Sequence, residues 1–175
     1  KLCESYNRQF NVDYRCVMPT NLYGPGDNYH SENSHVIPGL IDRFHKAKKN
    51  NLPSVTIWGT GMPRREFLYV DDVARASIHL MNIDKSIYDK FTSPMRTHIN
   101  IGSGIDLTIK ELAEVIKNVV GFKGEIEFDT SKLDGSPRKL LNSQRIKDLG
   151  FKQEVNLEDG LKFTYADYIK TNGNF

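Results

Sequence analysis

The sequence predicts an α/β fold, and three observations support this prediction. Short runs rich in valine, isoleucine and aromatic residues alternate along the chain with longer segments whose apolar residues recur at helical spacing. Turns containing glycine or proline separate most of these segments. No internal repeat or low-complexity tract interrupts the alternation. Strands that alternate with helices are typical of sheets covered by helices.

In the first half of the chain, Pro19 ends the first predicted strand because proline lacks a backbone donor, and Asp71 or Asp72 is the expected cap of a helix. A loop rich in turn-forming residues follows Pro19, and loops of that length are usually functional or disordered. The predicted elements are a helix already under way at Lys1, a strand over 13–18, the loop over about 20–34, a helix over about 36–48, strands over 55–58 and 66–70, and the helix after Asp72.

In the second half, the clearest local signal is a capping box formed by Thr108 and Glu111, followed by an amphipathic helix that Gly121 ends. No glycine-rich dinucleotide-binding loop follows any strand, because the run at 102–104 lacks the third glycine. The other predicted elements are strands over 97–101 and 125–128, a turn over 134–137, a short helix over about 142–149 and a closing helix marked by Leu157, Leu161, Tyr165 and Tyr168.

Composition excludes several classes of protein. The chain has 175 residues, enough for one domain or a small domain with part of another, and 24 Lys and Arg nearly balance 22 Asp and Glu. A nucleic-acid coat protein and a disordered acidic tail are therefore excluded. The two cysteines form no pattern with each other or with histidine, so we expect no disulfide framework and no metal site. No apolar run is long enough for a bilayer, and we expect a cytoplasmic protein without a membrane partner.

Several motifs are similar to those of the extended short-chain dehydrogenases/reductases that act on sugar nucleotides. They are Met-Pro-Thr-Asn-Leu-Tyr-Gly-Pro at 18–25, Ser-His-Val-Ile-Pro at 34–38, Trp-Gly-Thr-Gly at 58–61 and Arg-Arg-Glu-Phe-Leu-Tyr-Val-Asp-Asp at 64–72. The context of His35, together with Asp-Gly-Ser-Pro-Arg-Lys at 134–139, resembles the GDP-L-fucose synthase group within that family. The resemblance covers essentially the whole chain.

The resemblance implies the C-terminal, substrate-binding part of such an enzyme, with the N-terminal Rossmann dinucleotide-binding core mostly absent. Residues 1–35 would be a remnant of the Rossmann domain, holding the end of the catalytic helix, one strand and the active-site loop. Residues 36–175 would be mainly a substrate-binding α/β domain, with some returning elements that pack on the Rossmann part. The start at Lys1 inside a helix without a cap also suggests a fragment.

The implied reaction is epimerisation of GDP-4-keto-6-deoxy-D-mannose at C3 and C5, followed by reduction at C4 by NADPH. Protons next to a ketone are exchanged by a weak acid or base that titrates near neutral pH, and histidine meets this requirement. His35 is therefore the candidate general acid. The family's serine, tyrosine, lysine and cysteine would lie upstream of Lys1, so we expect no turnover by this chain alone.

The resemblance also implies residues that bind ligands. Arginine offers paired donors to a diphosphate, and Arg43 and Arg65 match substrate-binding positions. The other implied substrate contacts are Asn21, Trp58, Asp134 and Lys139. Pro19, Thr20, Asn21 and Leu22, with His35, match the segment beside the nicotinamide of NADPH. The implied partners are a GDP-sugar and, in the full-length protein, a second copy in a homodimer.

Three alternatives remain open on the sequence alone. A UDP-sugar 4-epimerase or another sugar-nucleotide epimerase or dehydratase shares most of the motifs but does not require histidine at position 35. A sugar-nucleotide-binding module without catalysis would carry the same binding residues. Nucleic-acid binding through the basic residues at 43–49 is disfavoured, because no series of aromatic residues accompanies them and the net charge is only +2.

Overall fold

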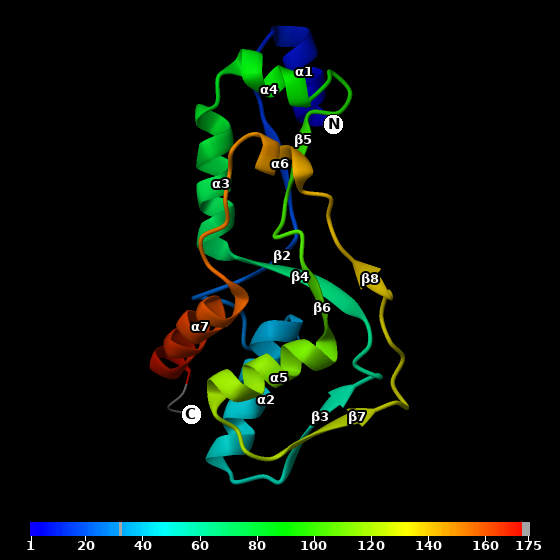
Figure 1. The fold of residues 1–175 in the computed structure, drawn as a ribbon, viewed down its shortest axis with the longest axis vertical. Helices are drawn as coiled ribbons and strands as arrows, with labels where there is room; N and C mark the ends of the chain where they lie inside the picture. Colours follow the sequence, from blue (N-terminus) through cyan, green and yellow to red (C-terminus); the bar gives the residue numbers. More distant parts are fainter. Residues whose placement is uncertain (32, 173–175) are drawn as a thin grey trace.

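The computed structural model describes residues 1–31 and 33–172, which form an elongated α/β molecule (Figure 1). The helices are α1 (Leu2–Phe10), α2 (Val36–Lys49), α3 (Val70–Asn82), α4 (Lys85–Phe91), α5 (Ile109–Val120), α6 (Gln144–Asp148) and α7 (Leu157–Thr171). The strands are β1 (Cys16–Pro19), β2 (Asn21–Tyr23), β3 (Ser54–Trp58), β4 (Arg64–Tyr69), β5 (His98–Ile101), β6 (Asp106–Thr108), β7 (Glu125–Asp129) and β8 (Arg138–Lys139).

Pairing between strands joins parts of the chain that are far apart in sequence. β1 pairs in parallel with β5, β3 pairs in parallel with β7, and β4 lies between β2 and β6, with β8 also paired to it. The β2, β4 and β8 pairings are parallel, whereas β6 is antiparallel to β4. Parallel pairs require crossover connections, which here contain helices. The predicted α/β class is therefore confirmed.

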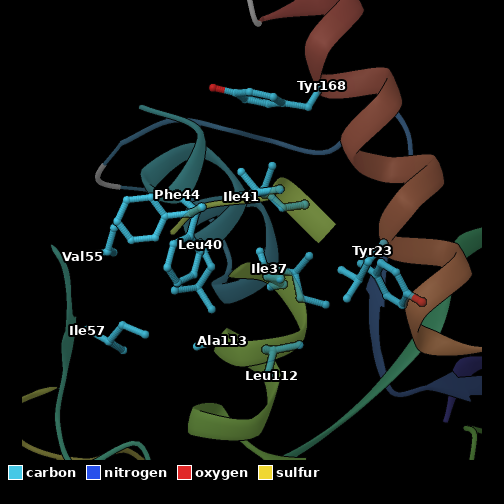
Figure 2. Packing of buried hydrophobic residues seen from close by; sticks show 14 of the residues in the cluster. Tyr23, Ile37, Leu40, Ile41, Phe44, Val55, Ile57, Leu112, Ala113 and Tyr168 are labelled. Atoms are coloured by element: carbon cyan, nitrogen blue, oxygen red, sulfur yellow. The ribbon is translucent and has the colours of Figure 1, made fainter. Parts of the chain in front are cut away.

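The larger hydrophobic cluster lies where α2, α5 and α7 meet β3 at one end of the molecule. Both α2 and α5 carry apolar residues at intervals of three and four, which places them on one face. Figure 2 shows this packing, with side chains of α2 facing those of β3 and α5: Ile37, Leu40, Phe44, Val55, Ile57, Leu112 and Ala113. Each buried leucine, isoleucine or phenylalanine side chain contributes roughly 1.5–3 kcal/mol by leaving water.

A second cluster lies towards the other end and joins α3, α4 and α6 to β5. Leu80 of α3, Tyr88 of α4, Ile99 of β5 and Ile146 of α6 are all at most 3% exposed. Arg15 lies against this cluster, with its guanidinium carbon 4.7 Å from the centroid of the Tyr88 ring. Burial raises the pKa of Tyr88 to about 12, and its hydroxyl donates to the carbonyl of Thr97 at 2.6 Å.

Several short elements differ from the prediction. The segment predicted as a loop over 20–34 contains β2, so residues 1–35 hold two strands and not one. β6, β8 and helix α4 were not predicted, and β1 is shorter than expected, because it begins at Cys16. Strands of two or three residues carry too little alternation to be recognised, since they exist only because distant segments pair with them.

The predicted cap of α3 was wrong. The helix begins at Val70, directly after β4, and its cap position is Tyr69, whose side chain makes no capping hydrogen bond. Asp72 is instead fully buried, and its carboxylate accepts from the backbone N–H groups of Glu154 and Val155 at 2.9 and 3.1 Å. Arg75 pairs with the same carboxylate at 2.5 Å. A buried carboxylate needs such partners, so Asp72 anchors the segment before α7.

Within the described residues, no helix combines the length and the apolar character needed to cross a membrane.

Candidate functional site

Two adjacent cavities share part of their wall. Cavity 1 has a volume of about 220 Å³ and lies between the start of α2, the end of β3, β4 and the segment over 133–135. This segment has no regular secondary structure, so the turn predicted over 134–137 is not present there. Cavity 2, of about 590 Å³, lies between β2, the start of α2 and β4. His35 and Arg65 line both cavities, as do Val36 and Ile109. A ligand that occupied both cavities would therefore pass between His35 and Arg65.

His35 is placed by the start of α2. It occupies the cap position of this helix in an extended conformation, and its carbonyl accepts the first helical hydrogen bond, from Gly39, at 3.0 Å. Its side chain is exposed. The start of a helix carries partial positive charge, which favours anionic groups beside it. The exposed His35 side chain is accessible where the two cavities meet.

Two cations lie near the indole of Trp58, and one of them, Arg43, lines cavity 1. Arg43, about two helical turns after His35, and Trp58, at the end of β3, both line this cavity. The Arg43 guanidinium carbon lies 5.6 Å from the centroid of the Trp58 ring, and Lys132 Nζ lies 5.9 Å from the same ring. These are cation–π distances. Trp58 is 66% exposed, so one of its surfaces remains accessible beside the cavity.

Asp134 is held at the edge of cavity 1 by Thr60. The Thr60 hydroxyl donates to one carboxylate oxygen at 2.6 Å, and the Thr60 backbone N–H donates to the other at 2.9 Å. These two hydrogen bonds, the hydroxyl foremost, lower the pKa of the Asp134 carboxyl. The carboxylate is therefore an acceptor on the cavity wall.

Arg65 is also held in place. Its guanidinium Nη1 donates to the backbone carbonyls of Arg64 at 2.8 Å and Ser136 at 2.7 Å. Because a guanidinium has five N–H donors, these two bonds orient the group and leave others for a ligand. Arg43 and Arg65 thus line one cavity with two cationic groups suited to a diphosphate.

Cavity 2 is lined by both apolar and polar residues. Phe67, Val36, Pro38 and Ile109 supply apolar surface. Thr20, just before β2, and Asn21 and Leu22, at its start, also line the cavity. The Thr20 hydroxyl and the Asn21 amide both donate to the carbonyl of Glu66, at 3.2 and 2.8 Å. An apolar lining with a few polar groups is typical of small-molecule sites.

Glu66 organises the floor of this region. Its side chain is fully buried, and Oε1 accepts from the backbone N–H of Gly104 at 2.6 Å and from the Ser103 hydroxyl at 3.3 Å. Oε2 accepts from the backbone N–H of Leu141 at 3.0 Å. One carboxylate therefore connects β4, the loop after β5 and the segment after β8.

The structure brings most of the predicted site residues together. His35, Arg43, Trp58, Arg65 and Asp134 line cavity 1, and Thr20, Asn21, Leu22 and His35 line cavity 2. Two predicted residues do not line either cavity. Pro19 is exposed at the end of β1, where it pairs with Ile101, and Lys139 is exposed in β8, where it pairs with Arg65 in register.

The sequence reasoning missed Thr60, Glu66 and Lys132 at this site. A carboxylate at the start of a predicted strand, directly before the apolar run Phe-Leu-Tyr-Val, was a usable signal for Glu66, because a buried acid requires several donors. Thr60 and Lys132 gave no such signal, since their partners lie far away in sequence. Among residues 1–31 and 33–172 no group of three or more His, Cys, Asp or Glu side chains could hold a metal ion.

Comparison with known proteins agrees with this architecture. Residues 1–102 match the NAD dependent epimerase/dehydratase family, more than half of the chain. The chain belongs to this family.

Similar proteins include a GDP-L-fucose synthase of Escherichia coli (strain K12), which is 55% identical over all of this chain and 54% of the relative. A probable GDP-L-fucose synthase 1 of Oryza sativa subsp. japonica is 51% identical over 97% of this chain and 49% of the relative. The crystal structure of a GDP-L-fucose synthetase from Naegleria fowleri bound to NADP has a TM-score of 0.84, with 29% identity over 98% of this chain and 53% of that one. The chain thus spans about half the length of these relatives.

Proposed function

We propose that this chain provides the substrate-binding part of an NADPH-dependent enzyme that converts GDP-4-keto-6-deoxy-D-mannose to GDP-L-fucose. The observation that carries the proposal is that His35 and Arg65 line both cavities. One cavity has the cations and the indole that suit a nucleoside diphosphate, and the other suits a nicotinamide. The sugar between them would lie beside His35. The names of the relatives support the same choice of substrate.

In this proposal, Arg43 and Arg65 bind the diphosphate, and Trp58 packs beside the nucleotide. Arginine provides planar pairs of donors that match phosphate oxygens. Trp58 already contacts Arg43, so its exposed surface is held in one orientation. The Asp134 carboxylate accepts hydrogen bonds from hydroxyl or N–H groups of the nucleoside. Lys139 and Asn21 remain proposed substrate contacts, and Pro19 a proposed cofactor contact.

His35 acts as the general acid that returns a proton to the sugar after epimerisation. The hydrogens at C3 and C5 are acidic because both carbons flank the C4 ketone, and removal of either proton leaves an enolate. Protonation of the enolate on the opposite face inverts the carbon. When bound, NADPH would supply the hydride for reduction at C4. Thr20, Asn21, Leu22 and His35 would hold the nicotinamide end of this cofactor.

The proposal extends to the complete protein. We propose that residues 1–35 belong to its dinucleotide-binding domain and residues 36–175 mainly to its substrate domain. The pairing of β1 with β5 supports this division, because β5 returns to the first segment. We also propose a cytoplasmic homodimer. Leu2, Tyr6 and Phe10 of α1 are 72%, 43% and 55% exposed at helical spacing, which gives the helix an apolar face for assembly.

The binding step is tested by titrating this chain with GDP and with UDP while recording proton–nitrogen correlation NMR spectra. We expect shifts of amides around cavity 1 with GDP and much smaller shifts with UDP. Arg43→Ala should weaken GDP binding about tenfold or more, because it removes a charge-assisted contact. The matched control is Arg96→Ala, which removes an exposed arginine that does not line either cavity. Equal shifts with GDP and UDP would favour a different sugar-nucleotide enzyme.

The catalytic step is tested in a polypeptide that joins this chain to the N-terminal half of the Escherichia coli relative. We expect NADPH oxidation that depends on GDP-4-keto-6-deoxy-D-mannose. His35→Asn should abolish inversion at C3 and C5 while GDP still binds, because the enolate then lacks a proton donor on the opposite face. Normal inversion in the His35→Asn protein would contradict the role of His35. Sedimentation velocity and cell fractionation of the same polypeptide test the homodimer and its location.

A further inference from the structure

The segment over 134–136, which has no regular secondary structure, is held from two sides at the edge of cavity 1. Asp134, at its start, is bound by Thr60 through both carboxylate oxygens. The carbonyl of Ser136, at its end, accepts from the Arg65 guanidinium. Thr60 lies in the connection between β3 and β4, 74 residues before Asp134. The position of the Asp134 carboxylate is therefore set by a residue that does not itself line either cavity.

The orientation of the Thr60 hydroxyl is also determined. The backbone N–H of Met62 donates to Thr60 Oγ1 at 3.2 Å, which occupies a lone pair of the hydroxyl. The single hydroxyl proton is then donated to Asp134 at 2.6 Å. Because the Thr60 backbone N–H binds the second oxygen, the plane of the carboxylate is fixed. A carboxylate accepts about four hydrogen bonds, so about two remain for a ligand.

Gly59 allows this close approach. Its φ of +83° lies in the left-handed region, and a Cβ atom at this position would collide with the Asp134 carboxylate oxygen. Thr60 can therefore reach Asp134 because the preceding residue has no side chain. The hydrogen bonds between Thr60 and Asp134 therefore join the connection between β3 and β4 to the segment over 134–136.

We propose that Thr60 is a positioning residue for nucleotide binding in cavity 1, holding the Asp134 carboxylate so that its remaining lone pairs accept hydrogen bonds from hydroxyl or N–H groups of a nucleoside diphosphate. This inference rests on the proposed function, because it takes cavity 1 as the nucleotide site. Thr60 acts through Asp134 and does not contact the ligand. An acceptor that is already oriented binds more tightly, since the ligand does not bear the cost of ordering it.

Calorimetric titration of GDP into this chain tests the proposal. Thr60→Val keeps the size of the side chain and removes the hydroxyl, and it should raise the Kd about tenfold, as expected for loss of an oriented, charged acceptor. Thr60→Ser restores the hydroxyl and should bring the Kd within about twofold of the native value. The matched control is Ser131→Ala, which removes a hydroxyl that donates to the Asp129 carboxylate in the neighbouring loop at 2.5 Å. It should leave the Kd unchanged.

Repeating Thr60→Val in an Asp134→Asn background tests whether Thr60 acts through Asp134. We expect less than a twofold further change, because coupled residues are not additive. An equal tenfold effect in both backgrounds, or an unchanged Kd for Thr60→Val alone, would overturn the inference. Absence of GDP binding by the native chain would instead count against the proposed function. Urea unfolding checks that each variant is folded. If Thr60→Val is not folded, Thr60→Ala replaces it, and we expect the same rise of about tenfold in the Kd for GDP.

Discussion

The Glu66 carboxylate and the backbone N–H of Leu141 are joined by a 3.0 Å hydrogen bond that spans 75 residues of sequence. The same side chain is fully buried and also binds Gly104 and Ser103. Two separate segments are therefore bound to one charge on β4, next in sequence to Arg65.

Replacement of Glu66 by glutamine should lower the free energy of unfolding by about 2–4 kcal/mol. The amide places an NH₂ donor against the N–H groups of Gly104 or Leu141, which leaves a buried donor unsatisfied. Urea unfolding followed by circular dichroism measures the difference. Glu114→Gln, on the exposed face of α5, is the control and should change stability by less than about 0.5 kcal/mol. A stable Glu66→Gln protein would mean that the two segments are held by other contacts.

Acid should weaken the fold partly through Asp106. Its carboxylate pairs with Arg138 and Arg64, and these cations, Arg138 foremost, lower its pKa from the ordinary value of 3.8. A carboxyl with a lowered folded-state pKa stabilises the protein above pH 3.8 and loses this effect as the pH falls through the folded-state value. Asp106→Asn should therefore be less stable than the native chain at pH 7, and this difference in stability should shrink as the pH falls below 3.8. A difference that persists undiminished in acid would contradict this explanation.

Tyr168→Phe should lower the free energy of unfolding by about 1–3 kcal/mol. The Tyr168 side chain is buried, and its hydroxyl donates to Asp42 at 2.8 Å, so phenylalanine leaves a buried carboxylate with one partner fewer. Lys46 still pairs with Asp42 at 2.8 Å, which keeps the loss moderate. Thermal unfolding measures the effect. The comparison variant is Tyr14→Phe. Because Tyr14 is 50% exposed, this variant should lose less stability than Tyr168→Phe, and equal losses would contradict the prediction.

Gly61→Ala should destabilise the chain by about 2 kcal/mol or more and also disturb cavity 1. Gly61 has a φ of +75°, and a Cβ atom there would collide with the ring of Phe128. Gly26 has almost the same φ, +76°, but open space around it, so Gly26→Ala should cost only the backbone strain of about 1 kcal/mol. Equal losses of unfolding free energy in Gly61→Ala and Gly26→Ala would show that the contact with Phe128 does not contribute to the loss of stability.

Local patterns were sufficient for the long helices. The helix expected over 36–48 is α2, and the capping box of Thr108 and Glu111 is present at the start of α5 with both hydrogen bonds formed. Such features depend on residues three or four apart, so the sequence displays them directly. The cap of α3 was mispredicted, because the Asp72 carboxylate accepts from backbone N–H groups 82 and 83 residues away and not from the first backbone N–H groups of α3.

The α/β class and the amphipathic helices could be predicted from local patterns, and a family resemblance added the residue types of the candidate site. The fold was needed to show that Arg43, Trp58, Arg65 and Asp134 line one cavity, with His35 at its junction with a second. It also decided that Pro19 and Lys139 lie outside both cavities. The reason is that the residues that define a helix lie within one turn of one another in the sequence. A binding site is made by strand pairings and side-chain hydrogen bonds between distant segments, such as the hydrogen bond between Thr60 and Asp134.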